Sequence, residues 1–194
     1  MTFSGYDTFD DPYAYDGTTV LKNRLGTKDP AILEAFELEM TTLRATEPLP
    51  RGRFGPAHYC AIHHHLFQDV YSWAGRYRTV RTAKGGNWFC YPEHISAQMS
   101  HIFSELKDQA FLTDQTFEGF IVRASHFLAE LNAIHPFREG NGRTQLSFLH
   151  LLAIKVGHPL ALDRVRPDQF LQAMIRSFSS DTTLLEQELA LLRA

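Results

Sequence analysis

Residues 135–143 read His-Pro-Phe-Arg-Glu-Gly-Asn-Gly-Arg and lie between two segments whose apolar residues recur at helical spacing. The first segment covers residues 117–131, and the second covers residues 144–156. Because both flanks are predicted to be helical, the nonapeptide is predicted to be the loop that joins them. This helix–loop–helix unit constrains the fold more than any other stretch of the chain.

The side chains of the nonapeptide favour phosphate chemistry. His135 can remove or deliver a proton near neutral pH. Glu139 offers the hard oxygen ligands that Mg²⁺ prefers when phosphates also hold the ion. Arg143, in the first turn of the next helix, can add a charge-assisted contact to an anion. That helix opens with three residues whose unpaired N–H groups, together with the helix dipole, favour a phosphate: Gly140, Asn141 and Gly142.

Length and composition indicate one ordinary globular domain. The chain has 194 residues, of which 44% are hydrophobic and 21% charged, so it can bury a substantial core. Its net charge of −3 gives no broad attraction to nucleic acid or to an anionic membrane. Cys60 and Cys90 are too few for a disulfide framework, and no apolar run approaches the ~20 residues of a membrane span. The N-terminus also lacks the features of a signal peptide. We therefore expect a cytoplasmic protein with no direct nucleic-acid or membrane partner.

The pattern along the chain predicts a mainly α fold. Residues 1–16 lack periodicity and are expected to form a flexible arm before a single domain of residues 17–194. A cap at residues 113–115 is predicted to start the long helix that ends near Asn132. The helix over residues 144–156 is apolar nearly all round, so it is predicted to be buried at the centre of a bundle. Further helices are predicted over residues 30–44, 56–71, 92–106, 167–178 and 182–192.

Residues 77–91 instead predict a β-hairpin. Residues 77–82 alternate in the manner of a strand, residues 85–87 (Gly-Gly-Asn) form a turn, and residues 88–91 are a short aromatic return strand. A lone hairpin is only marginally stable in water, so this one is expected to lie against the helices. Three consecutive histidines, residues 63–65, point in different directions on a helix, so a packed helix face is favoured over a metal site.

The nonapeptide resembles the signature of the Fic (filamentation-induced-by-cAMP) family, His-Pro-Phe-x-Asp/Glu-Gly-Asn-Gly-Arg-x-x-Arg. All nine positions up to Arg143 fit, whereas Leu146 stands where the family has its final arginine. Residues 15–23 and 62–75 resemble further segments of bacterial Fic toxins, which pair with a small antitoxin, and of secreted Fic effectors. The resemblance covers nearly the whole chain from Tyr13 onward.

The resemblance implies a Fic fold, which is a helical bundle around a central buried helix with a β-hairpin flap beside the active site. It implies a protein adenylyltransferase that moves AMP from ATP to a Ser, Thr or Tyr hydroxyl of a target protein. His135 would be the base and Glu139 would hold Mg²⁺, while residues 140–142 line the anion hole and Arg143 contacts the phosphate tail. The flap tip, which registers an extended target segment by strand addition, would be Lys84, Gly85, Gly86, Asn87, Trp88 and Phe89.

The resemblance also carries expectations about partners and regulation. By family analogy, toxins of this type modify DNA gyrase and topoisomerase IV, and secreted relatives modify host GTPases. Residues 182–186 match the family's inhibitory motif only in part, so a small antitoxin that supplies an inhibitory helix is the expected regulator.

Three residues of the signature region need a separate interpretation. Phe137 is expected to anchor the loop in the core, and Arg138 is expected to face solvent. Leu146 can supply neither a hydrogen bond nor a charge. An alternative therefore stays open, in which a Fic-fold protein binds nucleotide or a partner but transfers little or no AMP.

Overall fold

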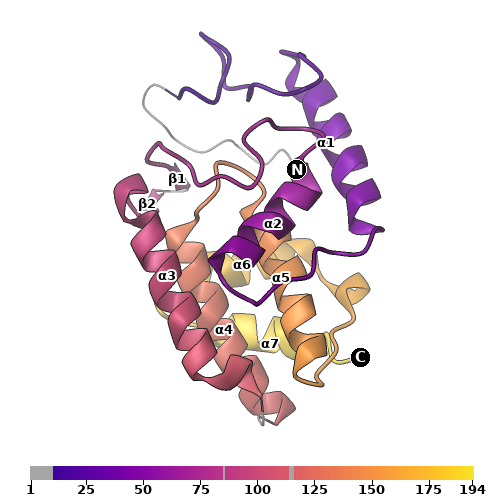
Figure 1. Cartoon of the computed structure of the whole chain (residues 1–194), viewed down its shortest axis with the longest axis vertical. Helices are drawn as coiled ribbons and strands as arrows, with labels where there is room; N and C mark the ends of the chain where they lie inside the picture. Colours follow the sequence, from indigo (N-terminus) through magenta and orange to yellow (C-terminus); the bar gives the residue numbers. More distant parts are fainter. Residues whose placement is uncertain (1–10, 85, 114–115) are drawn as a thin grey trace.

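A computed structural model describes residues 11–84, 86–113 and 116–194 (Figure 1). Within these residues the chain forms seven α-helices and one two-stranded antiparallel hairpin, which confirms the mainly α fold. The hairpin pairs β1 (Ala83–Lys84) with β2 (Asn87–Trp88). The strand predicted over residues 77–82 is therefore wrong, because this segment bonds to the loop of residues 135–143 instead, with the N–H of Arg78 donating to the carbonyl of Pro136. The return strand predicted over residues 88–91 is shorter and begins one residue earlier. Two short 3-10 helices are η1 (Ala110–Leu112) and η2 (Leu162–Arg164). The α-helices are α1 (Pro30–Ala45), α2 (Pro56–Phe67), α3 (Pro92–Asp108), α4 (Phe117–Ile134), α5 (Asn141–Lys155), α6 (Pro167–Ser177) and α7 (Thr183–Ala190).

Local sequence signals set where most helices begin. Helices α1, α2, α3 and α6 each start with proline, whose fixed φ and missing N–H suit the first helical turn. Asp29 caps α1 by accepting from the N–H groups of Ala31 and Ile32 at 2.9 and 3.2 Å. The cap of α4 is Thr116, which accepts from the N–H of Gly119 at 3.1 Å. The cap predicted at residues 113–115 falls partly outside the described residues.

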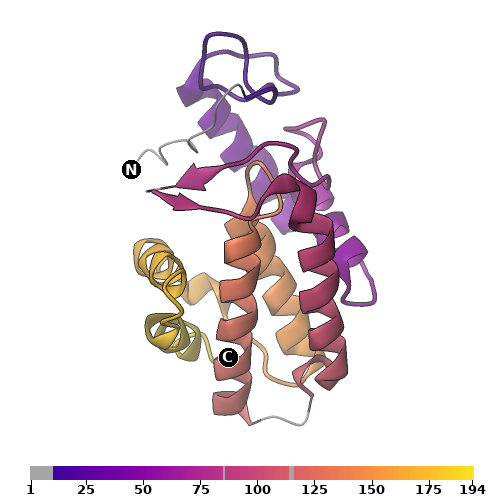
Figure 2. The same ribbon diagram turned by 90° about the vertical axis from the view of Figure 1, so that its left-hand side faces the viewer.

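Helices α3, α4 and α5 run side by side along the long axis, as Figures 1 and 2 show. Helix α2 packs on α5 and also contacts α1, whereas α6 and α7 pack together against α4. Helix α5 lies within the bundle as predicted, with Phe148, Leu149 and Leu152 buried, although its apolar pattern continues to Ile154, which is 52% exposed in the last turn. Helix α4 shares the central position, since it contacts α3, α5, α6 and α7.

The core is organised around one aromatic side chain of α5. Phe148 is fully buried and packs with its ring edge-on to Tyr59 of α2 and Phe103 of α3, at centroid distances of 5.6 and 5.3 Å. Phe127 of α4 completes the cluster at 5.9 Å. Four helices therefore meet at this residue, two turns after the start of α5, and the start of α5 is held in place.

Helix α2 ends at Phe67, earlier than the predicted end at Tyr71. The chain turns here, with the N–H of Val70 donating to the carbonyl of Phe67 at 3.0 Å. This turn lets Tyr71 stack on Trp73 at a centroid distance of 4.4 Å, which a continuous helix would prevent. Apolar packing therefore overrides the helical periodicity at this point.

The segment before α1 packs onto the signature loop. Residues 1–10 of the predicted flexible arm lie outside the described residues, but residues 11–16 make defined contacts. Ala14 is buried and bridges to Leu21, and Asp11 forms an ion pair with Arg138 at 2.7 Å. The Asp11 and Arg138 side chains are only 9% and 5% exposed. The expectation that Arg138 faces solvent is therefore wrong, because a carboxylate from a distant segment covers it.

None of the helices in the described residues is long and apolar enough to cross a membrane.

Candidate active site

The nonapeptide forms the loop between α4 and α5, as predicted. Its first residue, His135, is the C-cap of α4 and adopts a left-handed conformation with φ of 49°. Asn141 closes the loop on itself: its Oδ1 accepts from the N–H of Phe137 at 3.0 Å, and its Nδ2 donates to the carbonyl of Phe137 at 2.8 Å. The buried Asn141 side chain therefore shapes the loop, while its backbone opens α5.

Phe137 anchors the loop in the core, as the sequence predicted. It is fully buried and stacks on the ring of His63 from α2 at a centroid distance of 3.8 Å. His63 also accepts at Nδ1 from the N–H of Gly75 at 2.8 Å, which fixes its proton on Nε2. The Nε2–H group donates to the carbonyl of Glu139 at 3.0 Å, and burial lowers the pKa of His63 to about 3. Neutral His63 therefore holds the loop against α2 by stacking on Phe137 and donating to the carbonyl of Glu139.

The other two histidines of this run have separate partners. His64 Nδ1 lies 3.1 Å from the carbonyl of Ala74, and His65 Nε2 lies 2.9 Å from the carbonyl of Arg44. Their divergence from His63 agrees with the interpretation of residues 63–65 as a packed helix face rather than a metal site.

The His135 imidazole lies against the flap. Its ring stacks on Phe89 at a centroid distance of 3.9 Å with 14° between the planes, and the residue is 7% exposed. Burial, together with the positive charge of Arg78, lowers the pKa of His135 to about 3. The imidazole is therefore neutral at physiological pH and has a nitrogen able to accept a proton. Bound anionic phosphates would raise this pKa, because a nearby negative charge favours the imidazolium.

Glu139 and Arg143 lie at the far end of the loop in a cluster of charges. Arg143 Nη2 forms an ion pair with Glu37 of α1 and lies 3.8 Å from Glu139 Oε1. Its Nη1 donates to Thr41 at 3.2 Å, and its guanidinium lies 4.6 Å from the ring centre of Phe67. Burial and the charge of Glu37 raise the pKa of Glu139, while Arg143 opposes them. Arg143 is thus already oriented by α1 at the edge of the site.

Of the residues after Glu139, Gly140 is closely packed against the core whereas Gly142 faces open space. Gly140 has φ of +79°, and a Cβ placed on it would lie 2.2 Å from Cζ of Phe67. Its N–H donates to Glu139 Oε1 at 2.8 Å. A Cβ placed on Gly142, in contrast, would meet no atom within 4 Å. The first turn of α5 therefore presents an uncovered backbone at Gly142, where an anion can approach.

The donors of this loop fit Mg²⁺ held jointly with phosphates. The side chain of Glu139 is 32% exposed and lies beside the start of α5. One carboxylate next to an anion cradle matches the usual mode, in which one or two carboxylates and substrate phosphates hold the ion. In the part of the chain that the structure describes, no group of three or more His, Cys, Asp or Glu side chains can hold a metal by itself. Phosphates would therefore have to supply further ligands.

The flap lies beside the loop as expected from the hairpin pattern (Figure 2). Ala83 pairs with Trp88 and Lys84 with Asn87, and Gly86 turns the chain with φ of 82°. Trp88 is 45% exposed, with the Arg81 guanidinium 4.4 Å from its ring centre. Gly85, the remaining predicted flap residue, lies outside the described residues. Phe89, at the end of the flap, stacks directly on the ring of His135.

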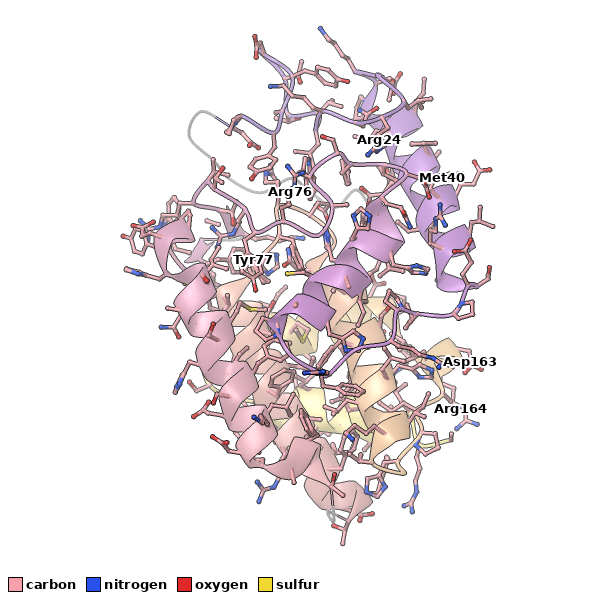
Figure 3. The ribbon with its side chains drawn as sticks, in the orientation of Figure 1. Arg24, Met40, Arg76, Tyr77, Asp163 and Arg164 are labelled. Atoms are coloured by element: carbon pink, nitrogen blue, oxygen red, sulfur yellow. The ribbon has the colours of Figure 1, made fainter. Side chains whose placement is uncertain are left out.

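Two residues that the sequence did not single out hold the site. Glu37 comes from α1 and pairs with Arg143, and Arg78 lies in the segment between α2 and the flap. Figure 3 labels Arg76 and Tyr77, the two residues that precede Arg78 in this segment. Both Glu37 and Arg78 reach the loop over long sequence distances, so no local pattern could have identified them. Only the buried position of Arg78, at 2% exposure, marks it as unusual.

Comparisons with known proteins agree with this geometry. A sequence profile of the Fic/DOC family matches residues 53–153. The chain is 50% identical over 185 residues to the probable protein adenylyltransferase y4lH of Sinorhizobium fredii, covering 95% of this chain and 96% of that one. It is 36% identical to the probable protein adenylyltransferase Fic of Salmonella typhimurium, covering 84% of this chain and 82% of that one.

Solved structures with the same fold include nucleotide complexes. The BepC effector of Bartonella tribocorum with bound AMPPNP matches with a TM-score of 0.85 and 25% identity, covering 94% of this chain and 96% of that chain. The N-terminal Fic domain of a VirB-translocated effector from Bartonella quintana with bound ADP matches with a TM-score of 0.86 and 25% identity, covering 94% of each chain. The signature loop, the helical fold and these relatives together show that this chain belongs to the Fic/DOC family.

Proposed function

We propose that this protein is an adenylyltransferase that moves AMP from ATP to a hydroxyl side chain of a target protein. The observation that carries the proposal is the arrangement of the signature loop. It holds a neutral, buried His135 against the flap at one end and Glu139, Gly142 and Arg143 around an open helix start at the other. Curated relatives named protein adenylyltransferases, and relatives solved with AMPPNP or ADP, support the same activity.

The proposed reaction needs a base and a site for a charged leaving group. The target hydroxyl loses its proton to His135, and its oxygen forms a bond to the α-phosphorus of ATP. The bond between that phosphorus and the oxygen bridging to the β-phosphate breaks, and pyrophosphate leaves with the bond electrons. Arg143 and the N–H groups around Gly142 stabilise the charge that develops on the phosphates. Glu139 would hold Mg²⁺ together with the phosphates, and the bound ion would neutralise part of that charge.

The flap supplies a surface for the target. A two-stranded hairpin can accept an extended peptide through main-chain pairing, which positions a hydroxyl with little demand on its sequence. The contact between Phe89 and His135 places this edge beside the base. We propose that residues 84–89 register the target in this way. By analogy with Fic toxins, DNA gyrase and topoisomerase IV are the candidate targets, and a small antitoxin is the candidate regulator.

The proposal is tested by incubating the protein with ATP labelled on its α-phosphate and a bacterial lysate. Label should appear on protein with the wild type and fall by at least ~100-fold with His135→Ala, because general-base catalysis contributes roughly 10²–10⁴-fold. Equal label transfer by both proteins would overturn the role of His135. Mass spectrometry of labelled proteins would then identify the target and decide whether it is a topoisomerase.

Leu146 favours one alternative, a Fic-fold protein that binds nucleotide with little transfer. Leu146 is partly buried and packs against the hydrophobic core, so it lies one turn along α5 from Arg143 without adding charge to the site. In the same assay, Leu146→Arg separates the two functions. Label transfer that appears only with the arginine would support the binding protein, whereas robust transfer by the wild type would reject it.

A further inference from the structure

Arg78 is a buried cation whose guanidinium donates to four backbone carbonyls. Its Nε donates to the carbonyl of His135 at 2.8 Å, and its Nη2 donates to the carbonyl of Ile134 at 3.1 Å. Both carbonyls belong to the end of α4, where helical carbonyls lack partners within the helix and the helix dipole is negative. A guanidinium is suited to this place, because it is planar, always charged and rich in donors.

The same guanidinium also binds both legs of the flap. Its Nη1 donates to the carbonyl of Val80, which precedes β1, and its Nη2 donates to the carbonyl of Cys90, which follows β2, at 2.6 Å each. The backbone N–H of Arg78 donates to the carbonyl of Pro136 at 2.8 Å. One residue thus connects the two legs of the hairpin with three consecutive residues of the signature region.

His135 needs such support because of its backbone. A left-handed conformation is unfavourable for a non-glycine residue, and the residue before a proline is further restricted. His135 has φ of 49° and precedes Pro136. Arg78 donates to the carbonyl of His135 through its side chain and to the carbonyl of Pro136 through its backbone N–H. These two contacts favour the left-handed conformation of His135. The direction of the imidazole follows from it.

We infer that Arg78 is a positioning residue that fixes the flap and His135 as one unit. It thereby sets the distance between a target strand docked on the flap and the base that must reach the hydroxyl of that strand. This role rests on the proposed function. It differs from the role of His63, which holds the carbonyl of Glu139 at the phosphate end of the loop. Arg78 therefore supports the part of the loop that faces the target, and His63 supports the part that faces the nucleotide.

The paired variants Arg78→Lys and His63→Gln test this division. Lysine keeps the charge of Arg78 but cannot reach four carbonyls, and a misplacement of 1 Å can cost ~100-fold in rate. With α-labelled ATP and lysate protein, Arg78→Lys should lower the rate at saturating ATP by about 10–100-fold and change the KM for ATP by less than about twofold. His63→Gln should instead raise the KM for ATP. A purely structural role for Arg78 predicts that rate and KM change together, and this result would overturn the inference.

Hydrogen exchange supplies a readout that needs no activity. Three amides report the unit: Arg78 bonded to Pro136, Cys90 bonded to Ala133, and His135 bonded to Leu131. In the wild type their protection factors should agree within about threefold, because one opening event exposes all three. Exchange of the Cys90 amide more than ~30-fold faster than that of His135 would refute the coupling, even if neither variant folds. Absence of transfer by the wild type would instead reject the proposed function and leave this measurement decisive for the coupling.

Discussion

Gly140 and Gly142 stand two positions apart in the same motif, yet the structure predicts opposite results for their replacement by alanine. At Gly140 the backbone has φ of +79°, and an added Cβ would lie 2.2, 2.4 and 2.9 Å from three ring carbons of Phe67. That ring cannot move aside easily, because Phe67 is fully buried and stacks on His63 at 4.8 Å. At Gly142 the φ is not left-handed, and the Cβ would meet nothing within 4 Å.

The magnitudes follow from these two environments. A left-handed alanine costs roughly 1–2 kcal/mol and an overpacked core roughly 1–3 kcal/mol, so Gly140→Ala should lower the free energy of unfolding by about 2–5 kcal/mol. Gly142→Ala lies in the first turn of α5 and should leave it unchanged or raise it by up to ~1 kcal/mol, because alanine favours helix. With a urea slope of about 2 kcal/mol per molar, the midpoint of Gly140→Ala should fall by about 1–2.5 M.

Equilibrium unfolding in urea, followed by circular dichroism, measures the difference directly. Calorimetric titration with AMPPNP and Mg²⁺ adds a second comparison, because the methyl group of Gly142→Ala would occupy the space proposed for a phosphate. That variant should therefore be as stable as the wild type but bind AMPPNP more weakly. Two midpoints within about 0.3 M of each other would refute the steric reasoning at Gly140. Unchanged AMPPNP binding by Gly142→Ala would refute the anion site.

Three further predictions concern the supports of the loop. The pKa of His63 is lowered to about 3 in the fold, so between pH 6.5 and 3 only the unfolded chain takes up this proton, and the free energy of unfolding decreases as the pH is lowered, by up to ~1.4 kcal/mol per pH unit. His63→Gln should reduce this slope of unfolding free energy against pH, and an unchanged slope would contradict the assignment. Asp11→Ala should cost about 3 kcal/mol because it removes the carboxylate from a buried ion pair with Arg138, and a double-mutant cycle with Arg138→Met should show a coupling energy above ~1 kcal/mol. Additive effects of the two substitutions would show that the pair is not coupled. Glu37→Ala removes the acceptor of both Arg143 and Tyr71 and should lower the free energy of unfolding by about 1–3 kcal/mol. Tyr71→Phe should lower it less in the same urea assay, and the reverse order would contradict the shared role of Glu37 as acceptor for both side chains.

The sequence identified those features that depend on neighbours in the chain. The helix starts at residues 30, 56, 92 and 167 and the hairpin turn depend on short-range signals, and the structure has each of them close to its predicted place. The loop between α4 and α5 and the anchoring of Phe137 were predicted for the same reason, since flanking helices and an apolar residue in a polar motif define them. Residues 140–143 also occupy the helix start that their spacing indicated.

The errors arise where a distant segment changes the outcome. Arg138 is buried, and Asp11 returns to pair with it from a segment 127 positions earlier in the chain, which no local pattern records. Helix α2 was predicted too long because Val70 and Tyr71 continue the apolar pattern, although they pack from a turn. Ile154 continues the apolar pattern of α5, but no described element covers it. Periodicity shows which residues are apolar, but it does not show which distant segments of the chain pack against them.

The contacts of the nonapeptide are also of two kinds, those between motif residues and those with distant segments, and the two kinds have different roles. Its internal bonds, between Asn141 and Phe137 and between Glu139 and Gly140, involve only motif residues and follow from the motif. The contacts that orient the proposed chemistry come from outside: Arg78 holds the His135 carbonyl, and His63 holds that of Glu139. The left-handed backbone of His135 is unfavourable without such support. The motif by itself therefore specifies a loop, and a chain needs residues 57 and 76 positions away to turn that loop into a positioned base beside a phosphate cradle.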